Sequence, residues 1–161
     1  MKSVLAIDIG GTFIKYGLIH ENYRISNKGK VKTPNTTTED FLDELKSLYD
    51  SYKEEIRGIA ISAPGRISEE GVMLTAGILE YLEGFNLAQE LSEVCDGISV
   101  TVENDGKAAA LCEATIGSGK DYPNSVALIF GTGIGGGVII NKEILRGCYL
   151  IAGEFSPLFT N

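Results

Sequence analysis

The feature that most constrains this chain is a unit that occurs twice: an apolar run, a glycine-rich turn and a second apolar run. The first copy occupies residues 4–19 around Gly10-Gly11-Thr12, and the second occupies residues 126–140 around the long turn Gly131–Gly137. β-branched and aromatic residues flank both turns, which predicts that each turn joins a strand to a strand. A duplicated unit of this kind indicates two related lobes.

Between the two copies the sequence alternates between helical and strand-like patterns. Thr36 with Glu39 fits a capping box before one helix, and Asn86 with Gln89 fits the start of another. The expected elements are a helix from Thr36–Thr38 to about Glu54, a strand at Arg57–Ser62, a helix from Asn86 to about Cys95, a strand at Ile98–Glu103 and a helix at Asp105–Ile116.

A loop of Gly, Ser, Pro and Asn at residues 117–124 marks the expected boundary between the lobes. We therefore expect a first lobe at residues 1–120 and the start of a second at residues 121–161. No helix follows the second pair of strands to cover them, and an open sheet exposes apolar surface and free edges. We interpret the sequence as a fragment of a longer protein.

Composition and charge exclude several classes of function. The net charge is −8 and the 14 Lys and Arg residues are scattered, so a nucleic-acid backbone would be repelled. No apolar run reaches the roughly 20 residues of a membrane span, and the N-terminus does not fit a secretory signal. Three distant cysteines, Cys95, Cys112 and Cys148, and one His20 predict no zinc site. We expect reduced, buried thiols in a cytoplasmic protein without nucleic-acid or membrane partners.

The glycine turns favour phosphate as the ligand. Glycine lets a ligand approach successive backbone N–H groups, which form concave anion sites. The chain has no Gly-Lys-Ser/Thr of a P-loop, and Gly131-x-Gly133-x-x-Gly136 leads into a strand, unlike a dinucleotide fingerprint. Thr12 and Thr132 lie at similar offsets in the two turns. The alternative, that each turn is only a tight hairpin, stays open.

Asp8 is an acidic residue inside the apolar run Val4–Ile9. A carboxylate there is costly to bury unless a cation or a hydrogen-bond donor meets it. A Mg²⁺ ion, contacted through water, would satisfy this requirement. The alternative is that Asp8 caps its own turn.

Four motifs then follow one another in order: Asp8-Ile9-Gly10-Gly11-Thr12, Glu103-Asn104-Asp105, Gly131–Gly137 and Ala152-Gly153-Glu154. In this order they resemble the ROK family of sugar kinases and sugar-responsive repressors. The resemblance implies an α/β chain with an actin-like ATPase (ribonuclease H-like) N-terminal lobe, the first strands of a second, similar lobe, and ATP and sugar in the cleft between them.

The same resemblance implies roles for individual residues. Asp105 matches the family's catalytic base, Asn104 and Glu154 match residues that bind sugar hydroxyls, and Gly65 lies in the loop that borders the sugar. The ATP phosphates would be held by Gly10, Gly11, Thr12, Gly131, Thr132, Gly133 and Gly135. A full-length protein of this kind is expected to use ATP and Mg²⁺; a homodimer is one open option, because the oligomeric state is not readable from the sequence.

The position of Asp105 agrees with this role on chemical grounds. It follows an expected strand and begins an expected helix, where free N–H groups and the helix dipole favour a negative charge. A carboxylate there can accept the proton of a primary hydroxyl as it attacks the γ-phosphorus. Asn104 and Asp105 can also simply cap the helix, and capping is compatible with catalysis.

One departure from the family pattern concerns zinc. The family's zinc-binding form reads Gly-Glu-x-Gly-His, whereas here Glu154 is followed by Phe155-Ser156-Pro157, with Pro157 in the place of the histidine. Proline has no group that ligates zinc or donates to a sugar hydroxyl. We therefore expect no zinc. The stretch Ala152–Phe155 resembles a subset that includes β-glucoside kinases.

The leading hypothesis is an enzyme that transfers the γ-phosphoryl group of ATP to the 6-hydroxyl of a hexose or hexoside. The second is a non-catalytic sugar-sensing regulator of the same family; an acidic chain that starts directly with a strand counts against it. The third is an actin-type assembly module, which would have no use for Asp105 and Glu154. We expect little or no kinase activity from residues 1–161 alone, because most of the second lobe would be missing.

Overall fold

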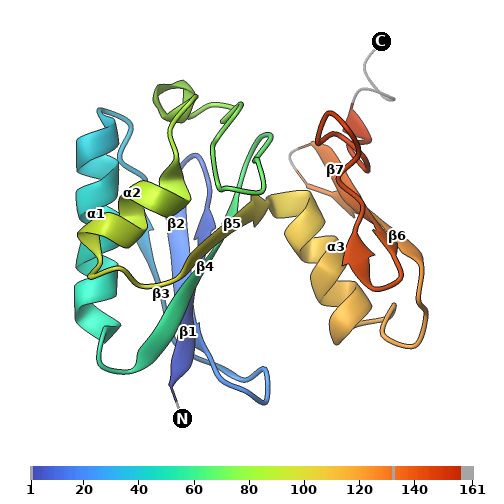
Figure 1. Ribbon diagram of the computed structural model, residues 1–161, viewed down its shortest axis with the longest axis horizontal. Coiled ribbons are helices and arrows are strands. Elements are labelled where there is room, and N and C mark those ends of the chain that lie inside the picture. The colour runs from blue at the N-terminus through green and yellow to red at the C-terminus, as the bar shows by residue number, and fades with distance from the viewer. Residues whose placement is uncertain (1, 132, 157–161) are drawn as a thin grey trace. The chain divides into compact units, whose positions relative to one another are not determined.

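The computed structural model describes residues 2–131 and 133–156, with an N-terminal α/β part and a smaller C-terminal part (Figure 1). The N-terminal elements are β1 (Ser3–Ile9), β2 (Phe13–Ile19), β3 (Ile25–Lys32), α1 (Thr38–Tyr52), β4 (Ile56–Ala63), the 3₁₀ helix η1 (Glu80–Leu82), α2 (Leu87–Val94) and β5 (Val100–Asn104). They are followed by α3 (Asp105–Thr115), β6 (Ser125–Phe130), β7 (Ile134–Ile140) and β8 (Glu143–Ile144).

The N-terminal sheet has five strands in the order β3-β2-β1-β4-β5. The first three strands form an antiparallel meander, in which Leu5 is paired with Leu18 and Asp8 with Lys15. The chain then crosses through α1 and returns as β4, which lies parallel to β1, with Leu5 paired with Ile59. A crossover helix is the usual way to make such a parallel pair. The expected strand–turn–strand start and the strand at residues 57–62 are confirmed.

One face of this sheet holds the main core. Leu5, Ile7 and Ile9 on β1 are at most 2% exposed and share a hydrophobic cluster with Phe41 and Leu45 of α1. The cluster also contains Leu87 and Leu91 of α2, so both helices cover the same face. Because side chains alternate along a strand, the residues between these on β1 point to the other face. Asp8 is one of them.

The N-terminal caps of the first two helices are only partly as expected. Asn86 caps α2, since its Oδ1 accepts a hydrogen bond from the Gln89 N–H at 3.1 Å. The cap of α1 is Thr37, whose Oγ1 accepts from the Asp40 N–H at 3.1 Å. The predicted capping box of Thr36 with Glu39 is therefore wrong by one residue. Three successive threonines offered equivalent hydroxyls, and the sequence did not distinguish them.

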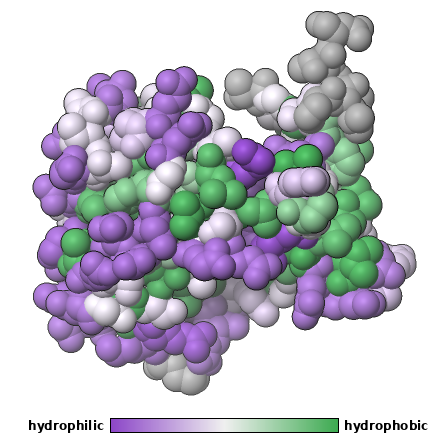
Figure 2. Space-filling view, turned by 45° about the horizontal axis from the view of Figure 1, so that its top comes forward, coloured by the Kyte–Doolittle hydropathy of each residue, from purple (hydrophilic) through white to green (hydrophobic). Residues whose placement is uncertain are grey.

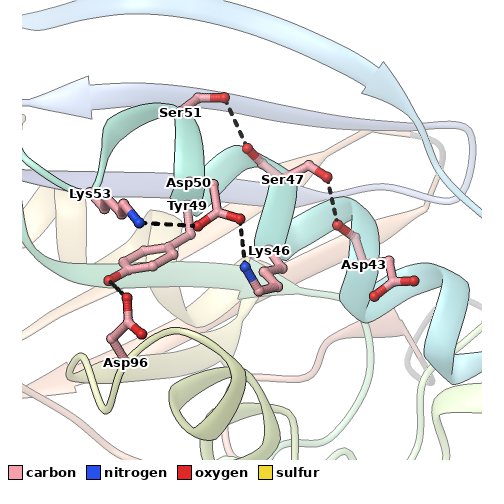
Figure 3. A network of polar contacts seen from close by, with 8 residues as sticks. All are labelled: Asp43, Lys46, Ser47, Tyr49, Asp50, Ser51, Lys53 and Asp96. Carbon is pink, nitrogen blue, oxygen red and sulfur yellow. Dashed lines mark hydrogen bonds and ion pairs between the residues drawn. The ribbon is translucent and has the colours of Figure 1, made fainter.

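A polar network ties α1 to the turn after α2 (Figure 3). The Tyr49 hydroxyl donates to the Asp96 carboxylate at 3.0 Å, and Lys46 pairs with Asp50 at 2.5 Å. Burial, and then the hydrogen bond to Asp96, raise the pKa of Tyr49 to about 12. Burial also raises the pKa of the neighbouring Cys95 thiol to about 11. Both groups are therefore protonated at neutral pH, and Cys95 is a buried, unreactive thiol as expected.

The C-terminal part is a three-stranded sheet, β6-β7-β8, covered by α3. Strand β7 begins at Ile134, so Gly135, Gly136 and Gly137 are strand residues paired with Ile129, Leu128 and Ala127. The expected long turn Gly131–Gly137 is therefore too long, and the turn itself ends before Ile134. Glycine lowers β-propensity, which is why these three residues were placed in a loop.

The described chain divides into two compact units, the first ending at Glu103 and the second beginning at Asn104. The division falls before α3, whereas the expected lobe boundary falls after it, at residue 120. The reason is local packing: Ala110 and Ala114 of α3 form a small core with Ile139 of β7. We describe the two units separately below.

Several large apolar side chains of the second unit are exposed. On β6 the outward residues Val126, Leu128 and Phe130 are 61%, 51% and 75% exposed. Figure 2 shows hydrophobic surface at the right of the view, over this unit. Cys112 and Cys148 are exposed as well, so the expectation that all three thiols are buried is wrong for these two. Among the described residues, no helix has the length and hydrophobicity needed to cross a membrane.

Candidate functional site

The first glycine turn is fixed by its own unit. The Gly10 N–H donates to the Phe13 carbonyl at 3.1 Å, and the buried Thr33 donates its hydroxyl to the Gly10 carbonyl at 2.6 Å. The Thr33 N–H also donates to the Thr12 carbonyl at 3.0 Å. Within residues 2–131 and 133–156, the N–H groups of Gly11 and Thr12 donate to no protein atom. Thr33 thus fixes the carbonyls of Gly10 and Thr12, and the N–H groups of Gly11 and Thr12 are available to a ligand.

The second glycine turn is more open. A β-carbon added to Gly131, Gly133 or Gly135 would meet no atom of residues 2–131 and 133–156 within 4 Å. Gly131 and Gly135 also lack the left-handed backbone that favours glycine. Packing of the described residues therefore does not explain these glycines, whereas the approach of a ligand to the backbone would. Thr132, the remaining residue of this predicted phosphate site, lies outside the described residues.

Asp8 lies two residues before the first turn and is not buried. Its Oδ2 pairs with Lys15 Nζ at 3.2 Å, and its Oδ1 accepts from the Ser62 hydroxyl at 2.7 Å. The Asp8 side chain is 49% exposed, so the premise that it is buried in an apolar run is wrong. The alternation of β1 explains the error, since Ile7 and Ile9 face the core and Asp8 does not. A half-exposed carboxylate still fits a Mg²⁺ ion that keeps most of its water.

Asn104 and Asp105 form the junction between β5 and α3. Asn104 is 4% exposed, and its Oδ1 caps the helix by accepting from the Lys107 N–H at 3.0 Å. Its Nδ2 donates to Asp105 Oδ1 at 3.1 Å, and the Gly106 N–H donates to the same oxygen at 2.7 Å. Capping is therefore done by Asn104, and the two donors hold one oxygen of Asp105.

The other oxygen of Asp105 is open. Asp105 is exposed, and in the described part of the chain its Oδ2 accepts no hydrogen bond. A carboxylate with one oxygen fixed by two donors has a defined orientation, and the second oxygen can accept a proton from a hydroxyl group. The arrangement suits a general base better than a residue that only caps.

Glu154 is half-buried at the end of the loop that follows β8. The loop is closed by hydrogen bonds from the Ala152 N–H to the Arg146 carbonyl and from the Glu154 N–H to the Ile151 carbonyl, both at 3.0 Å. Gly153 has a positive φ of 81°, and a β-carbon there would lie 2.7 Å from the Gly137 Cα. Only glycine lets the loop lie so close to β7, and this contact places Glu154.

The start of α3 packs against the same part of β7. A β-carbon on Gly106 would lie 2.8 Å from the backbone N and O of Gly136, and one on Gly137 would lie 3.2 Å from the Cα of Lys107. The helix start that carries Asn104 and Asp105 and the loop that carries Glu154 are therefore supported by two neighbouring glycines. The structure brings these three predicted sugar-binding residues into one unit.

Gly65 belongs to the first unit. Its φ is 92°, and a β-carbon there would be 2.6 Å from the Thr75 carbonyl carbon. The neighbouring Arg66 N–H donates to Thr75 Oγ1 at 2.9 Å, which closes the loop after β4. The glycine is therefore required by the loop itself, whether or not a sugar binds beside it.

Lys107 was missed by the sequence analysis. It is 2% exposed, and its Nζ donates to the Leu150 carbonyl at 3.0 Å. In the alanine-rich stretch 105–116 there was no apolar stripe to show which residues face inward, and a lysine is rarely buried. The only feature of the sequence that could have pointed to Lys107 as a site residue was its position two residues after Asp105.

The residues present give no support for a zinc centre. Within residues 2–131 and 133–156, no three His, Cys, Asp or Glu side chains are grouped so that they could hold a metal ion. Pro157, which stands where zinc-binding relatives have histidine, lies outside the described residues. The absence of zinc stays a prediction.

The sequence matches the ROK family over residues 4–156. It is 34% identical to a beta-glucoside kinase of Listeria monocytogenes over 158 residues, which are 98% of this chain and 53% of that protein. The structure resembles that of a ROK family glucokinase from Streptomyces griseus in complex with glucose and AMPPNP, with 31% identity, a TM-score of 0.83, and coverage of 95% of this chain and 49% of the other.

A third similarity is to a ROK family transcriptional regulator, a homolog of the E. coli MLC protein. It has 25% identity and a TM-score of 0.84, over 95% of this chain and 40% of the regulator. The chain thus belongs to the ROK family and has the α/β actin-like fold of its sugar kinases. It spans about half the length of the relatives it matches.

Proposed function

We propose that the intact protein transfers the γ-phosphoryl group of ATP to the 6-hydroxyl of a hexose or hexoside. The observation that carries this proposal is Asp105, whose Oδ1 is fixed by the Asn104 amide and the Gly106 N–H while its Oδ2 is open and exposed. Asn104 already caps the helix, and Asp105 uses only one of its two oxygens on it. An oriented, exposed carboxylate at a helix start suits proton transfer.

In this proposal Asp105 accepts the proton of the attacking hydroxyl late in the reaction. Phosphoryl transfer has a loose transition state, so the orientation of the hydroxyl contributes more than the strength of the base. Asn104 and Glu154 bind other sugar hydroxyls, and Gly65 borders the sugar. Charge on Glu154 suits it as an acceptor from neutral hydroxyl groups.

The phosphates of ATP are assigned to the two glycine turns. The free N–H groups of Gly11 and Thr12, next to Gly10, would bind oxygens of the phosphate chain. Gly131, Thr132, Gly133 and Gly135 would do the same from the second unit. Asp8 would hold a Mg²⁺ ion through water, and the ion would neutralise charge on the transferred phosphate. Lys15, which pairs with Asp8 in the structure, would then be free to contact a phosphate.

The relatives favour a glucose-type acceptor. The Listeria relative is a beta-glucoside kinase, and the Streptomyces griseus structure holds glucose and AMPPNP. We propose glucose or a β-glucoside as the acceptor and ATP as the donor. A panel of hexoses and β-glucosides, tested with the intact protein in a coupled assay for ADP, would rank them.

The decisive variant is Asp105→Asn in the intact protein. Asparagine keeps the shape and accepts the two hydrogen bonds at Oδ1, but it is not a base. We expect kcat to fall by about a thousandfold while the sugar Kd, measured by calorimetry, changes by less than about threefold. Unchanged turnover would rule out Asp105 as the base.

A sugar-sensing regulator is the second candidate, because a ROK family transcriptional regulator shares the fold. One experiment, which measures glucose binding and ADP formation together, distinguishes the regulator from the kinase. A protein that binds glucose but forms no ADP with any acceptor of the panel would support the regulator, and ADP formation that depends on Asp105 would support the kinase.

A further inference from the structure

Lys107 is buried at the end of α3 where a cation is least favourable. It lies in the first turn of the helix and is 2% exposed. A helix N-terminus carries partial positive charge, and burying an ammonium group is costly unless it is well hydrogen-bonded. Helix stability therefore does not account for a lysine at this position.

The ammonium group contacts the loop that carries Glu154. Lys107 Nζ donates to the Leu150 carbonyl at 3.0 Å, across 43 residues of sequence. Leu150 has a φ of 62°, a left-handed conformation that is uncommon for a residue other than glycine. The Leu150 N–H donates to the Gly147 carbonyl at 3.2 Å. The loop thus adopts a strained turn at the residue whose carbonyl receives the buried cation.

Lys142, in the same unit, makes hydrogen bonds that helix stability does explain, and it serves as a comparison for Lys107. Its Nζ donates to the carbonyls of Ala114, Gly119 and Lys120 at 2.9, 3.1 and 2.6 Å. These carbonyls lie at the C-terminal end of α3 and just beyond it, where a cation complements the helix dipole. Lys142 is exposed and lies at the opposite end of the helix from Asp105. The two lysines make the same kind of contact at opposite ends of one helix.

We propose that Lys107 is a positioning residue for sugar binding: by holding the Leu150 carbonyl, it fixes the Glu154 loop against the helix start that carries Asp105. This inference rests on the proposed role of Glu154 as a sugar ligand. Lys107 does not touch the sugar. Its contribution to sugar affinity passes through Glu154 and disappears when Glu154 no longer binds the sugar.

The test is a double-mutant cycle in the intact protein, with Lys107→Met, Glu154→Gln and both together. Methionine keeps most of the length of lysine but donates no hydrogen bond. The sugar KM and the sugar Kd are measured with glucose and with methyl β-glucoside. For Lys107→Met we expect both to rise about tenfold, with the ATP KM changed by less than about threefold. In the Glu154→Gln background the same substitution should raise them by less than about twofold.

Lys142→Met is the matched control. It should lower the thermal stability and leave the sugar KM and Kd within about twofold of the wild type. If Lys107→Met lowers Tm by more than about 10 °C, the cycle is repeated with Lys107→Gln, which keeps a polar end but is one bond too short to reach the Leu150 carbonyl, so the same rise in KM and Kd is expected. Equal losses from Lys107→Met with and without Glu154, or a wild-type Kd in the folded single variant, would overturn the inference.

The outcomes separate this inference from the proposed function. A wild-type protein that binds glucose without forming ADP contradicts the kinase proposal only, because the cycle can still be read from Kd. A folded Lys107 variant with wild-type affinity contradicts the inference only. A wild-type protein that binds neither sugar contradicts both.

Discussion

The two glycine hairpins have similar sequences but differ in what surrounds them. The first turn is held by its own unit, through Thr33 behind it and the side chain of Ile78 in the place where a β-carbon of Gly11 would be. In the second turn, no atom of the described residues lies within 4 Å of the β-carbon positions of Gly131, Gly133 and Gly135. Its crowded glycines are the next two, in strand β7. Gly136 is buried against the Ala127 carbonyl and Phe155, and Gly137 against α3.

Glycine therefore has two different surroundings in the second hairpin. Gly136 and Gly137 let a helix and a loop pack on the strand, while the glycines before them have open space, which our proposal assigns to a phosphate. In the first hairpin these surroundings are not separated, because the turn is short and β2 continues with larger residues. The first three predictions below test this division and the fourth compares the two units, from the largest effect to the smallest.

The largest effect is expected at Gly137. In Gly137→Val the new β-carbon would lie 2.6 Å from the Ala110 Cβ, so α3 must move away from β7. We expect a loss of about 3 kcal/mol in unfolding free energy, measured by urea denaturation of the intact protein. A valine tolerated with less than about 0.5 kcal/mol would show that helix and strand are not packed this closely.

Gly135 should behave in the opposite way. Because a β-carbon there has open space, Gly135→Ala should leave stability within about 0.5 kcal/mol of the wild type. It should raise the ATP KM about tenfold, since the methyl group would occupy the space proposed for a phosphate. An unchanged ATP KM would remove Gly135 from the phosphate site and leave its glycine unexplained.

Thr33 tests how the first turn is held. Thr33→Val removes the hydroxyl that donates to the Gly10 carbonyl at 2.6 Å while keeping the shape of the side chain. We expect a loss of about 1 kcal/mol in stability and a several-fold rise in the ATP KM. Thr115→Val is the control, because its exposed hydroxyl donates within α3 to the Leu111 carbonyl. If both variants change the ATP KM equally, the turn does not depend on Thr33.

The smallest effect is expected at Tyr49, in the first unit. Tyr49→Phe removes the hydrogen bond to the exposed Asp96 and should cost about 0.5 kcal/mol at pH 7. The pKa of Tyr49 is raised from 10.0 to about 12, so in this range the native state binds more protons than the unfolded state. Stability therefore falls as pH rises between these values.

The pH dependence gives a second reading of Tyr49→Phe. The variant should lack the part of the wild-type stability loss that occurs between pH 10.0 and about 12. Thermal unfolding of the wild type and the variant across this pH range measures the difference in stability loss. If Tyr49→Phe and Gly137→Val each shift a different unfolding transition, the two units unfold independently. If both substitutions shift the same transition, the unfolding of the two units is coupled.

Much of the first unit was predictable from the sequence. The strand–turn–strand start at residues 4–19 and the Asn86 cap each have a local physical cause, and both are confirmed. What failed depended on partners distant in sequence. Asp8 was read as buried because its neighbours are apolar, although the two faces of β1 have different surroundings. Gly135–Gly137 were read as a turn because the packing of Gly136 against Phe155 and of Gly137 against α3 is invisible in the sequence.

The residues of the candidate site stay predictions, and the contacts that support them could not be predicted from the sequence. Asn104, Asp105 and Glu154 follow from the ordered motifs, and the structure adds that one oxygen of Asp105 is fixed and one is open. Lys107 could not be predicted, because its acceptor is a main-chain carbonyl, which every residue carries. Likewise, the need for Gly153 arises from the approach of its loop to Gly137 and not from its own turn alone.

The strand order of the first sheet also has a consequence for synthesis on the ribosome. Strand β1 pairs with β2 over a short hairpin, Leu5 with Leu18, but it pairs with β4 only through the distant Ile59. The meander of β1, β2 and β3 can therefore form while α1 and β4 are still being translated. Until β4 emerges, the edge of β1 that will pair with it is open to pairing with other chains, and slow translation between residues 33 and 56 would prolong its exposure.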